Sequence, residues 1–235
     1  MENVNETEAL LRISNGEKHM NYIDTLRLTG LFNKSLSSAT IIGCGAIGSK
    51  LAIELCKLGV NELFIYDNDK VESHNLSNQA FIMSDIGKPK VAALKERIAE
   101  ISSMEVVDYE ELFTKDTAPQ TDVVFLCVDN METRKEIIET VFRSGIVNHV
   151  IETRMGVDEL RVYHLEKDDI AKWVAQAYYP NAKAETSACG TSLTVGATAS
   201  ICASLACWQY MKLFMKDQYP VFEIIMSLEH YGILV

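Results

Sequence analysis

The sequence lacks several features that mark common protein classes. Its six cysteines include no pair in Cys-x-x-Cys spacing, so we expect no structural zinc. Positive charge is scarce: 22 Lys and Arg stand against 33 Asp and Glu, which gives a net charge of −11 and a pI of about 4.9. This balance gives no electrostatic support to nucleic-acid binding. The sequence also has no internal repeat and no low-complexity linker.

A secretory leader and a clear membrane span are missing as well. Residues 1–18 are polar and acidic, so we expect a loose tail there and a cytoplasmic protein with reduced thiols. The uncharged run 186–211 is long enough to cross a bilayer. Ser, Thr, Ala, Gly and Cys are frequent in this run, which favours a buried helix over a membrane span.

The sequence does contain enough apolar residues for one large core. It has 235 residues, 48% of them apolar, and this predicts a single domain over residues 1–235. The expected strands are 39–43, 62–67, 105–109, 122–128 and 147–152, and the expected helices are 19–36, 46–58, 90–101 and 130–144. This alternation predicts an α/β fold of the Rossmann-like, doubly wound kind with a mainly parallel sheet.

The alternation of strands and helices ends after Thr153. We expect an antiparallel strand at 159–165 and an irregular loop at 173–188. A long helix should follow at 191–214, and strands 221–226 and 230–235 should form a terminal hairpin. The parallel sheet is therefore predicted to carry an antiparallel C-terminal extension.

A glycine motif follows the first expected strand and opens a helix: Gly43-Cys44-Gly45-Ala46-Ile47-Gly48. The first glycine allows a tight turn, the second lets a phosphate approach the backbone, and the third lets helix and strand pack closely. The helix N-terminus also favours a phosphate. Asp67 ends the next strand, where an acidic side chain typically bonds ribose hydroxyls. These features suit NAD and ATP equally, so they leave an NAD-dependent oxidoreductase open.

The residues after Asp67 distinguish between the two nucleotides. The segment 67–79 resembles the conserved stretch of the ThiF/MoeB/HesA family, the bacterial relatives of ubiquitin-activating enzymes. The matching positions are Asp67, Asp69, Val71, Asn75, Leu76 and Gln79. The resemblance continues at Gly87-Lys88-Pro89-Lys90, Asp129-Asn130, Arg154-Met155-Gly156 and the small-residue helix that ends at Lys212. It covers most of the chain from Ala39 onward.

This resemblance implies adenylation of a carboxylate rather than hydride transfer. Family members join AMP from ATP to the C-terminal carboxylate of a small ubiquitin-like or sulfur-carrier protein ending in Gly-Gly, and they release pyrophosphate. Most form two-fold dimers, so we expect a homodimer that buries much of 191–214 or the preceding strands. The implied nucleotide-binding residues are Gly43, Gly45, Ala46, Gly48, Asp67, Asp69, Asn75, Gln79 and Lys90.

By the same resemblance, Asp67 and Lys90 hold the ribose, Asn75 lies near the phosphates, and Lys90 also reaches phosphate. Asp129 is the implied Mg²⁺ ligand. Attack of a carboxylate on the α-phosphate builds negative charge there, which a cation, a lysine and oriented amides stabilise. Mg²⁺ takes one or two carboxylates plus phosphate oxygens, so Asp129 alone is sufficient. Without this context, Lys90 is typical of a solvated helix start and Asp129 of an N-cap.

Two arginines of the family pattern are missing. Asn78 stands where the family has Arg before Gln, and residues 21–25 replace an Arg-Tyr-x-Arg-Gln segment whose second Arg reaches the partner subunit's ATP. Each lost charge-assisted contact removes about 1.5–3 kcal/mol. A catalytically degenerate subunit for nucleotide binding or assembly therefore remains an alternative. The family's zinc cysteines are absent too, as in some other members.

Cys189 precedes the long expected helix, where thiol-using family members carry a cysteine. The helix dipole would give it thiolate character, so it is our third catalytic candidate beside Lys90 and Asp129. The alternative is a loop cysteine that only packs. The other five cysteines lie in the glycine motif or in apolar runs and are predicted to pack: Cys44, Cys56, Cys127, Cys202 and Cys207.

Overall fold

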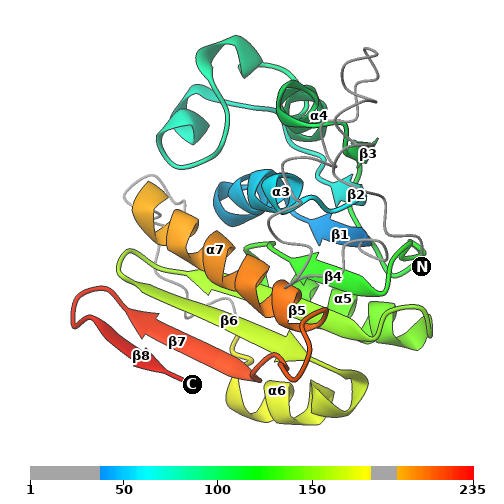
Figure 1. Ribbon diagram of the computed structural model, residues 1–235, viewed down its shortest axis with the longest axis vertical. Coiled ribbons are helices and arrows are strands. Elements are labelled where there is room, and N and C mark those ends of the chain that lie inside the picture. The colour runs from blue at the N-terminus through cyan, green and yellow to red at the C-terminus, as the bar shows by residue number, and fades with distance from the viewer. Residues whose placement is uncertain (1–37, 181–194) are drawn as a thin grey trace, which may run out of the picture.

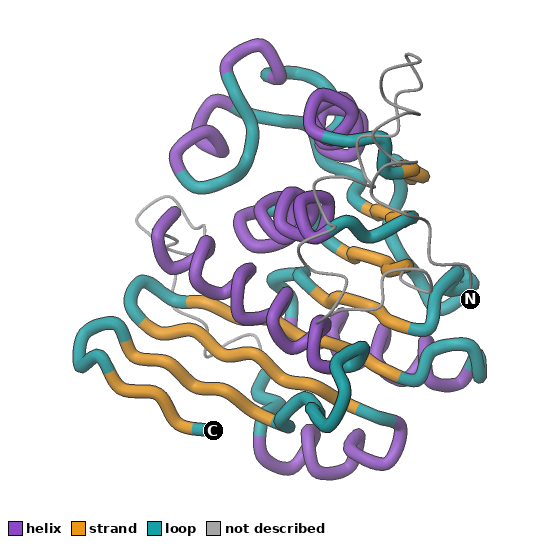
Figure 2. The backbone as a smooth tube through the Cα atoms, viewed as in Figure 1, coloured by secondary structure: helices purple, strands orange, loops and turns teal. Residues whose placement is uncertain are grey.

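The computed structural model describes residues 38–180 and 195–235, in which eight strands form one sheet with the order β3-β2-β1-β4-β5-β6-β7-β8. The strands are β1 (Ser38–Ile42), β2 (Glu62–Tyr66), β3 (Glu105–Tyr109), β4 (Val123–Leu126), β5 (His149–Met155), β6 (Glu159–Leu165), β7 (Glu223–Ser227) and β8 (Gly232–Leu234). Neighbours from β3 to β5 are parallel, and β5 to β8 are antiparallel. Figure 2 shows the strands as one continuous ladder.

Helices cover both faces of this sheet. They are α3 (Ala46–Leu58), α4 (Lys90–Ile101), α5 (Met131–Arg143), α6 (Ile170–Gln176) and α7 (Gly196–Lys212), with 3-10 turns η3 (Ser73–Ser77), η4 (Met83–Asp85) and η5 (Lys167–Asp169). One core lies between the sheet and α3, α4 and α7, and a second lies between the sheet and α5 and α6. Figure 1 shows α7 beside α3 and across β5 and β6.

Local sequence explains where these helices begin and end. Gly59 ends α3 in the left-handed conformation, with φ of 88°, and its N–H donates to the carbonyls of Leu55 and Cys56. Asn130 begins α5, because its side chain accepts a hydrogen bond from the Thr133 N–H at 2.9 Å. Parallel strands β1 and β4 are almost entirely buried, as expected for strands covered on both faces.

The structure confirms the α/β class, the parallel core and the antiparallel hairpin at the C-terminus. One expectation is wrong: residues 170–176 form α6, whereas we predicted an irregular loop from Trp173. Trp173 is fully buried and anchors this short helix in the second core. Strand β5 also continues three residues beyond Glu152, because β6 pairs with Arg154 and Met155.

Some expectations fall outside the described residues, including the helix 19–36, the start of the long helix at 191 and Cys189. No helix in ranges 38–180 and 195–235 combines the length and apolarity that crossing a membrane requires. Cys44, Cys56, Cys202 and Cys207 are buried as predicted, whereas Cys127 is only partly buried.

Candidate functional site

The loops after β1 and β4 meet where the strand order reverses. Such a reversal opens a crevice beyond the carboxyl ends of the strands, and this is where ligands bind in open α/β sheets. Strands β1 and β4 are neighbours although their sequences lie far apart, and the Cys127 N–H donates to the Ile42 carbonyl at 2.8 Å. The glycine motif and the segment that carries Asp129 therefore border the same crevice.

The three glycines of the motif have distinct surroundings. A Cβ on Gly43, which has φ of 94°, would lie 2.9 Å from the Cys127 backbone, and a Cβ on Gly48 would lie 1.9 Å from the Gly43 carbonyl oxygen. Both positions therefore require glycine for close packing. At Gly45 no atom of the described residues lies within 4 Å of the added Cβ. The start of α3 is thus open at the point where the motif predicts a phosphate.

Asp67 holds the glycine loop in shape. Its carboxylate accepts hydrogen bonds from the Cys44 N–H at 2.6 Å and the Asp69 N–H at 2.9 Å. Burial raises the pKa of Asp67 above its ordinary value, although Lys90 and the two N–H groups oppose that rise. A carboxylate has about four acceptor positions, so ribose hydroxyls can still bind. The structure therefore adds a loop-shaping role to the predicted ribose contact.

Lys90 enters the crevice from the start of α4. Its ammonium donates to Asp69 Oδ2 at 2.7 Å, with the lysine side chain 8% exposed and the aspartate 62% exposed. The Lys90 N–H also donates to the Asp69 carbonyl at 2.9 Å. Lys90 is therefore mostly buried, fixed by its ion pair with Asp69 and close to Asp67, rather than a solvated lysine at a helix start.

The segment 72–80 contains the 3-10 turn η3. Asn75 organises it: its side-chain oxygen accepts from the Glu72 N–H at 2.9 Å, and its carbonyl accepts from the N–H groups of Asn78 and Gln79. Among the described residues nothing accepts from the amide N–H groups of the Asn75 side chain, and these are the donors that a phosphate needs. Within the described residues, the buried side-chain oxygen of Gln79 has no hydrogen-bond partner.

Asp129 lies on the exposed turn between β4 and α5. The helix cap is the neighbouring Asn130, so the structure rules out the capping alternative for Asp129. No hydrogen bond or ion pair with another described residue occupies its carboxylate. Residues 38–180 and 195–235 contain no cluster of three His, Cys, Asp or Glu that could hold a metal. A single open carboxylate still fits Mg²⁺, whose other ligands are phosphate oxygens and water.

Comparison with known proteins identifies the family. The ThiF family matches residues 19–228, which is most of the chain. The chain belongs to the ThiF family. This confirms the resemblance drawn from segments 67–79 and 87–90.

Similar sequences include the sulfur carrier protein ThiS adenylyltransferase of Escherichia coli, 33% identical over 121 residues, or 49% of this chain and 48% of that protein. The tRNA threonylcarbamoyladenosine dehydratase of Bacillus subtilis is 29% identical over 160 residues and 62% of each chain. Adenylyltransferase and sulfurtransferase MOCS3 of Dictyostelium discoideum is 34% identical over 124 residues, covering 50% of this chain and 29% of that one. The chain thus spans between 29% and 62% of the length of these curated relatives.

Solved structures show the same fold at lower identity. PaaA has a TM-score of 0.70 at 20% identity, covering all of this chain and 75% of that one. E. coli MccB with ATP has a TM-score of 0.65 at 17% identity, covering 99% and 78%. Both likenesses extend over the whole ThiF-family sheet, including its antiparallel part.

The sequence analysis of this ThiF-family chain missed two sets of residues near the crevice. Ser49 joins the segment 72–80 to α3: its hydroxyl donates to the Gly45 carbonyl at 2.7 Å and accepts from the Ala80 N–H at 3.0 Å. Glu152 lies fully buried between Arg134 and Arg154. A charged residue at the end of a predicted strand was the available signal for Glu152, and it is a weak one. Ser49 left no comparable signal, because a serine in a helix is ordinary.

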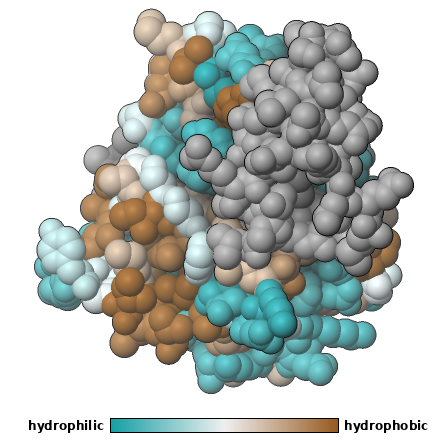
Figure 3. Space-filling view, in the orientation of Figure 1, coloured by the Kyte–Doolittle hydropathy of each residue, from teal (hydrophilic) through white to brown (hydrophobic). Residues whose placement is uncertain are grey.

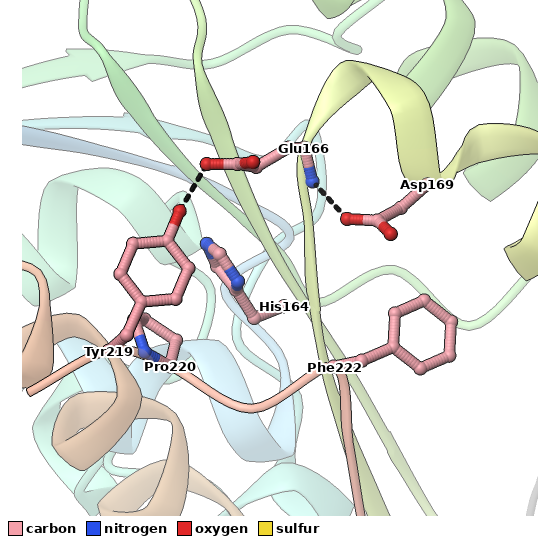
Figure 4. A pocket seen from close by; sticks show the side chains of 6 residues that line it. All are labelled: His164, Glu166, Asp169, Tyr219, Pro220 and Phe222. Carbon is pink, nitrogen blue, oxygen red and sulfur yellow. Dashed lines mark hydrogen bonds between the residues drawn. The ribbon is translucent and has the colours of Figure 1, made fainter.

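A second hollow lies at the amino-terminal end of β5, away from the ThiF-family glycine loop. Figure 4 shows the side chains that line it. The Tyr219 hydroxyl donates to the Glu166 carboxylate, and the Glu166 N–H donates to the Asp169 carboxylate. His164 in its wall contacts His149 ring to ring, Nε2 to Nδ1 at 3.1 Å. Burial, followed by His149, lowers the pKa of His164 to about 4. At neutral pH His164 is therefore an uncharged part of the core.

Proposed function

We propose that the protein uses ATP and Mg²⁺ to adenylate the C-terminal carboxylate of a small ubiquitin-like or sulfur-carrier protein. The observation that carries the proposal is the α3 N-terminus of a ThiF-family chain, where a Cβ on Gly45 would meet no described residue within 4 Å. Asp67 is bonded to the adjacent Cys44 N–H, Lys90 lies next to Asp67, and the exposed Asp129 follows β4, the strand beside β1. An anion-binding helix start beside a cation and a metal-binding carboxylate is the arrangement that phosphate transfer needs.

Each side chain has a definite task in this reaction. The N–H groups at the start of α3 bind phosphate, and Asp67 keeps them in place by accepting the Cys44 N–H. Lys90, released from or shared with Asp69, offers its ammonium to the phosphate that gains charge. Asp129 would hold Mg²⁺, which when bound supplies charge neutralisation to the phosphates.

The acceptor carboxylate is proposed from the relatives. One similar protein is named for adenylation of the sulfur carrier ThiS, and a structural neighbour was solved with AMPCPP and MccA. We infer a protein or peptide carboxyl terminus as substrate, with Gly-Gly as the leading candidate ending. Cys189 remains our candidate for a thiol that receives the activated acyl group.

A catalytically degenerate subunit is the second candidate. Asn78 occupies the position of a family arginine, so one phosphate contact of the family pattern is missing. Such a subunit would bind Mg·ATP without exchanging pyrophosphate. An NAD-dependent oxidoreductase has less support, because segments 67–79 and 87–90 follow the ThiF-family pattern.

Exchange of labelled pyrophosphate into ATP tests the proposal. The wild-type protein with its carrier and Mg²⁺ is expected to catalyse exchange, and Asp129→Ala is expected to abolish it while keeping the melting temperature. Asp168→Ala, an exposed acidic residue next to the second hollow, is the matched control and should exchange normally. Unchanged exchange in Asp129→Ala would remove Asp129 from the metal role. Mg·ATP binding without exchange in wild type would favour the degenerate subunit.

A further inference from the structure

Glu152 forms the centre of a buried charged network on the face of the sheet covered by α5 and α6. Its carboxylate accepts hydrogen bonds from Arg154 Nε at 2.8 and 3.0 Å and from Trp173 Nε1 at 3.3 Å, and it pairs with Arg134. Glu152 and Trp173 are fully buried, and the two arginines are 5% and 7% exposed. The three charged side chains therefore function as one unit.

This network is poorly arranged for stability alone. Two arginines and one glutamate leave a net charge of +1 in the interior, and burial of charge is unfavourable unless pairing is complete. Arg134 Nε and Arg154 Nη2 are buried without a hydrogen-bond partner among the described residues. Well-packed apolar side chains of the same volume often give equal or greater stability. The network therefore calls for a role other than core packing.

Arg134 holds the turn that carries Asp129. Its backbone N–H makes the ordinary helix hydrogen bond to the Asn130 carbonyl at 3.0 Å, and its guanidinium reaches from there to the Leu126 carbonyl at 3.5 Å and to Glu152. On the β1 side, the Cys127 N–H is bonded to the Ile42 carbonyl next to the glycine loop. The segment 127–130 is thus tied to β1 at Cys127, and the Arg134 side chain ties the first turn of α5, which follows the segment, to the end of β4 and to Glu152.

Arg154 connects the same glutamate to the end of α6. Its Nη1 donates to the Ala177 carbonyl at 2.6 Å. Its guanidinium lies over the rings of Tyr163, Trp173 and Tyr179 at 4.8, 5.5 and 5.6 Å from their centroids. A shift of Glu152 or Arg154 would therefore directly change the surroundings of the Trp173 indole.

Resting on the proposed function, we propose that Glu152 and Arg134 are positioning residues for Asp129. They would hold its carboxylate in place for Mg²⁺, which would neutralise charge on the phosphates of bound ATP. Through Glu152, binding of Mg·ATP changes the surroundings of the Trp173 indole. Both side chains are buried in the interior, so each acts through the turn 127–130.

The test combines Mg²⁺ dependence with a built-in fluorophore. The chain has two tryptophans, and Trp208 on α7 is 48% exposed, so Trp208→Phe leaves Trp173 as the single reporter. In this background Mg·ATP is expected to change Trp173 emission, whereas ATP with EDTA is not. Arg134→Met leaves a neutral pair of Glu152 and Arg154. It should raise the Mg²⁺ concentration for half-maximal exchange about tenfold or more, as for lost outer-shell partners of metal ligands.

Two further variants separate positioning from packing. Arg134→Lys keeps the positive charge, so its Mg²⁺ concentration for half-maximal exchange should lie between the values of wild type and Arg134→Met. It serves as the test variant if Arg134→Met does not fold. Arg161→Met is the matched control, because Arg161 pairs with Glu159 two residues away on the neighbouring strand. It should leave the Mg²⁺ dependence at the wild-type value.

Folded Arg134 variants with wild-type Mg²⁺ dependence and unchanged Trp173 response would overturn the inference, since a packing role lowers stability alone. Failure of the proposed function gives a different result: Mg·ATP changes Trp173 emission but wild type exchanges no pyrophosphate. In that case the Mg²⁺ concentration that the emission change requires is compared between wild type and the Arg134 variants, and this comparison tests the inference. Absence of any Mg²⁺-dependent binding to wild type overturns it as well.

Discussion

Gly45 and Gly48 lie three residues apart in the glycine motif, with Gly45 just before α3 and Gly48 in its first turn. A Cβ on Gly48 would meet the Gly43 carbonyl, whereas a Cβ on Gly45 would meet no described residue within 4 Å. Gly48 is therefore required by packing, and we propose that Gly45 serves the nucleotide, although both belong to one motif.

Substitution by alanine is expected to separate these two roles. Gly48→Ala should lower the free energy of unfolding by about 3 kcal/mol, because a methyl group 1.9 Å from the Gly43 carbonyl forces α3 away from β1. Gly45→Ala should change it by less than about 0.5 kcal/mol but weaken ATP binding. Urea unfolding and calorimetric titration with ATP measure the two effects. Equal destabilisation by both variants would contradict this assignment.

His164 makes stability depend on pH. In the unfolded chain its pKa is about 6.5, and in the native protein burial and His149 lower it to about 4, although Glu166 and Asp169 oppose this. Between these values the unfolded chain binds a proton that the native state excludes. Stability is therefore lost as the pH falls from about 6.5 to 4, by on the order of 3 kcal/mol.

Urea unfolding at pH 7 and pH 4 checks this contribution. His164→Gln keeps a polar partner for His149 but does not titrate, so it should lose less stability than wild type over the same interval. The carboxylates titrate in both proteins, and the difference between the two losses isolates His164. Equal losses would show that burial does not shift this imidazole.

Single residues could be predicted from the sequence where a local rule demands a residue type. Gly43 and Gly48 were predicted in this way from the glycine motif, and the structure gives each glycine a steric reason. The metal role of Asp129 came from the family resemblance and stays a prediction. Glu152 was not identified, because its partners come from α5, β5 and α6, and a pairing across three elements leaves no periodic signal.

Helix α5 offers a direct test of which residues stabilise the turn between β4 and α5. Asn130→Ala should lower the free energy of unfolding by about 1 kcal/mol, because the side chain that caps the Thr133 N–H is lost. Asp129→Ala should leave stability unchanged, because Asp129 caps nothing. Thermal unfolding of both variants measures the difference. A larger loss in Asp129→Ala than in Asn130→Ala would reverse the two assignments.

Helix and strand boundaries were predictable where glycine or a cap marks them, as in α3 and at the start of α5. Helix α6 was not, because it has seven residues and is held by the burial of Trp173 rather than by a periodic pattern. The extension of β5 to Met155 depends on pairing with β6 and cannot be predicted from the strand's own sequence. Tertiary contacts thus account for the differences.

The whole molecule presents apolar surface near α7. Figure 3 shows hydrophobic side chains gathered over the region of α7 and the β7–β8 hairpin. Trp208, Ile233 and Leu234 are 48%, 56% and 69% exposed. Exposed apolar area of this kind commonly marks an association surface. A homodimer that buries much of 191–214 or the preceding strands, as we expect from the sequence, would cover Trp208 of this surface.

Light scattering at micromolar concentration checks the assembly. Wild type is expected to have the mass of two chains, and Trp208→Glu the mass of one, because a charge would be buried in the interface. Glu229→Lys, an exposed charge reversal in the hairpin turn, is the control for altered charge alone. A wild-type monomer would contradict the dimer.

The strand order also determines when the protein can fold during synthesis. Strand β1 pairs with β4, and the core around Leu51 and Leu55 is completed by Ala203 and Ala206 of α7. Translation at about 5–20 residues per second separates α3 from α7 by roughly seven to thirty seconds. During that interval the apolar side of α3 emerges from the ribosome without its last partner. The nascent chain is then a natural client for a chaperone, and release before α7 would expose this core to aggregation.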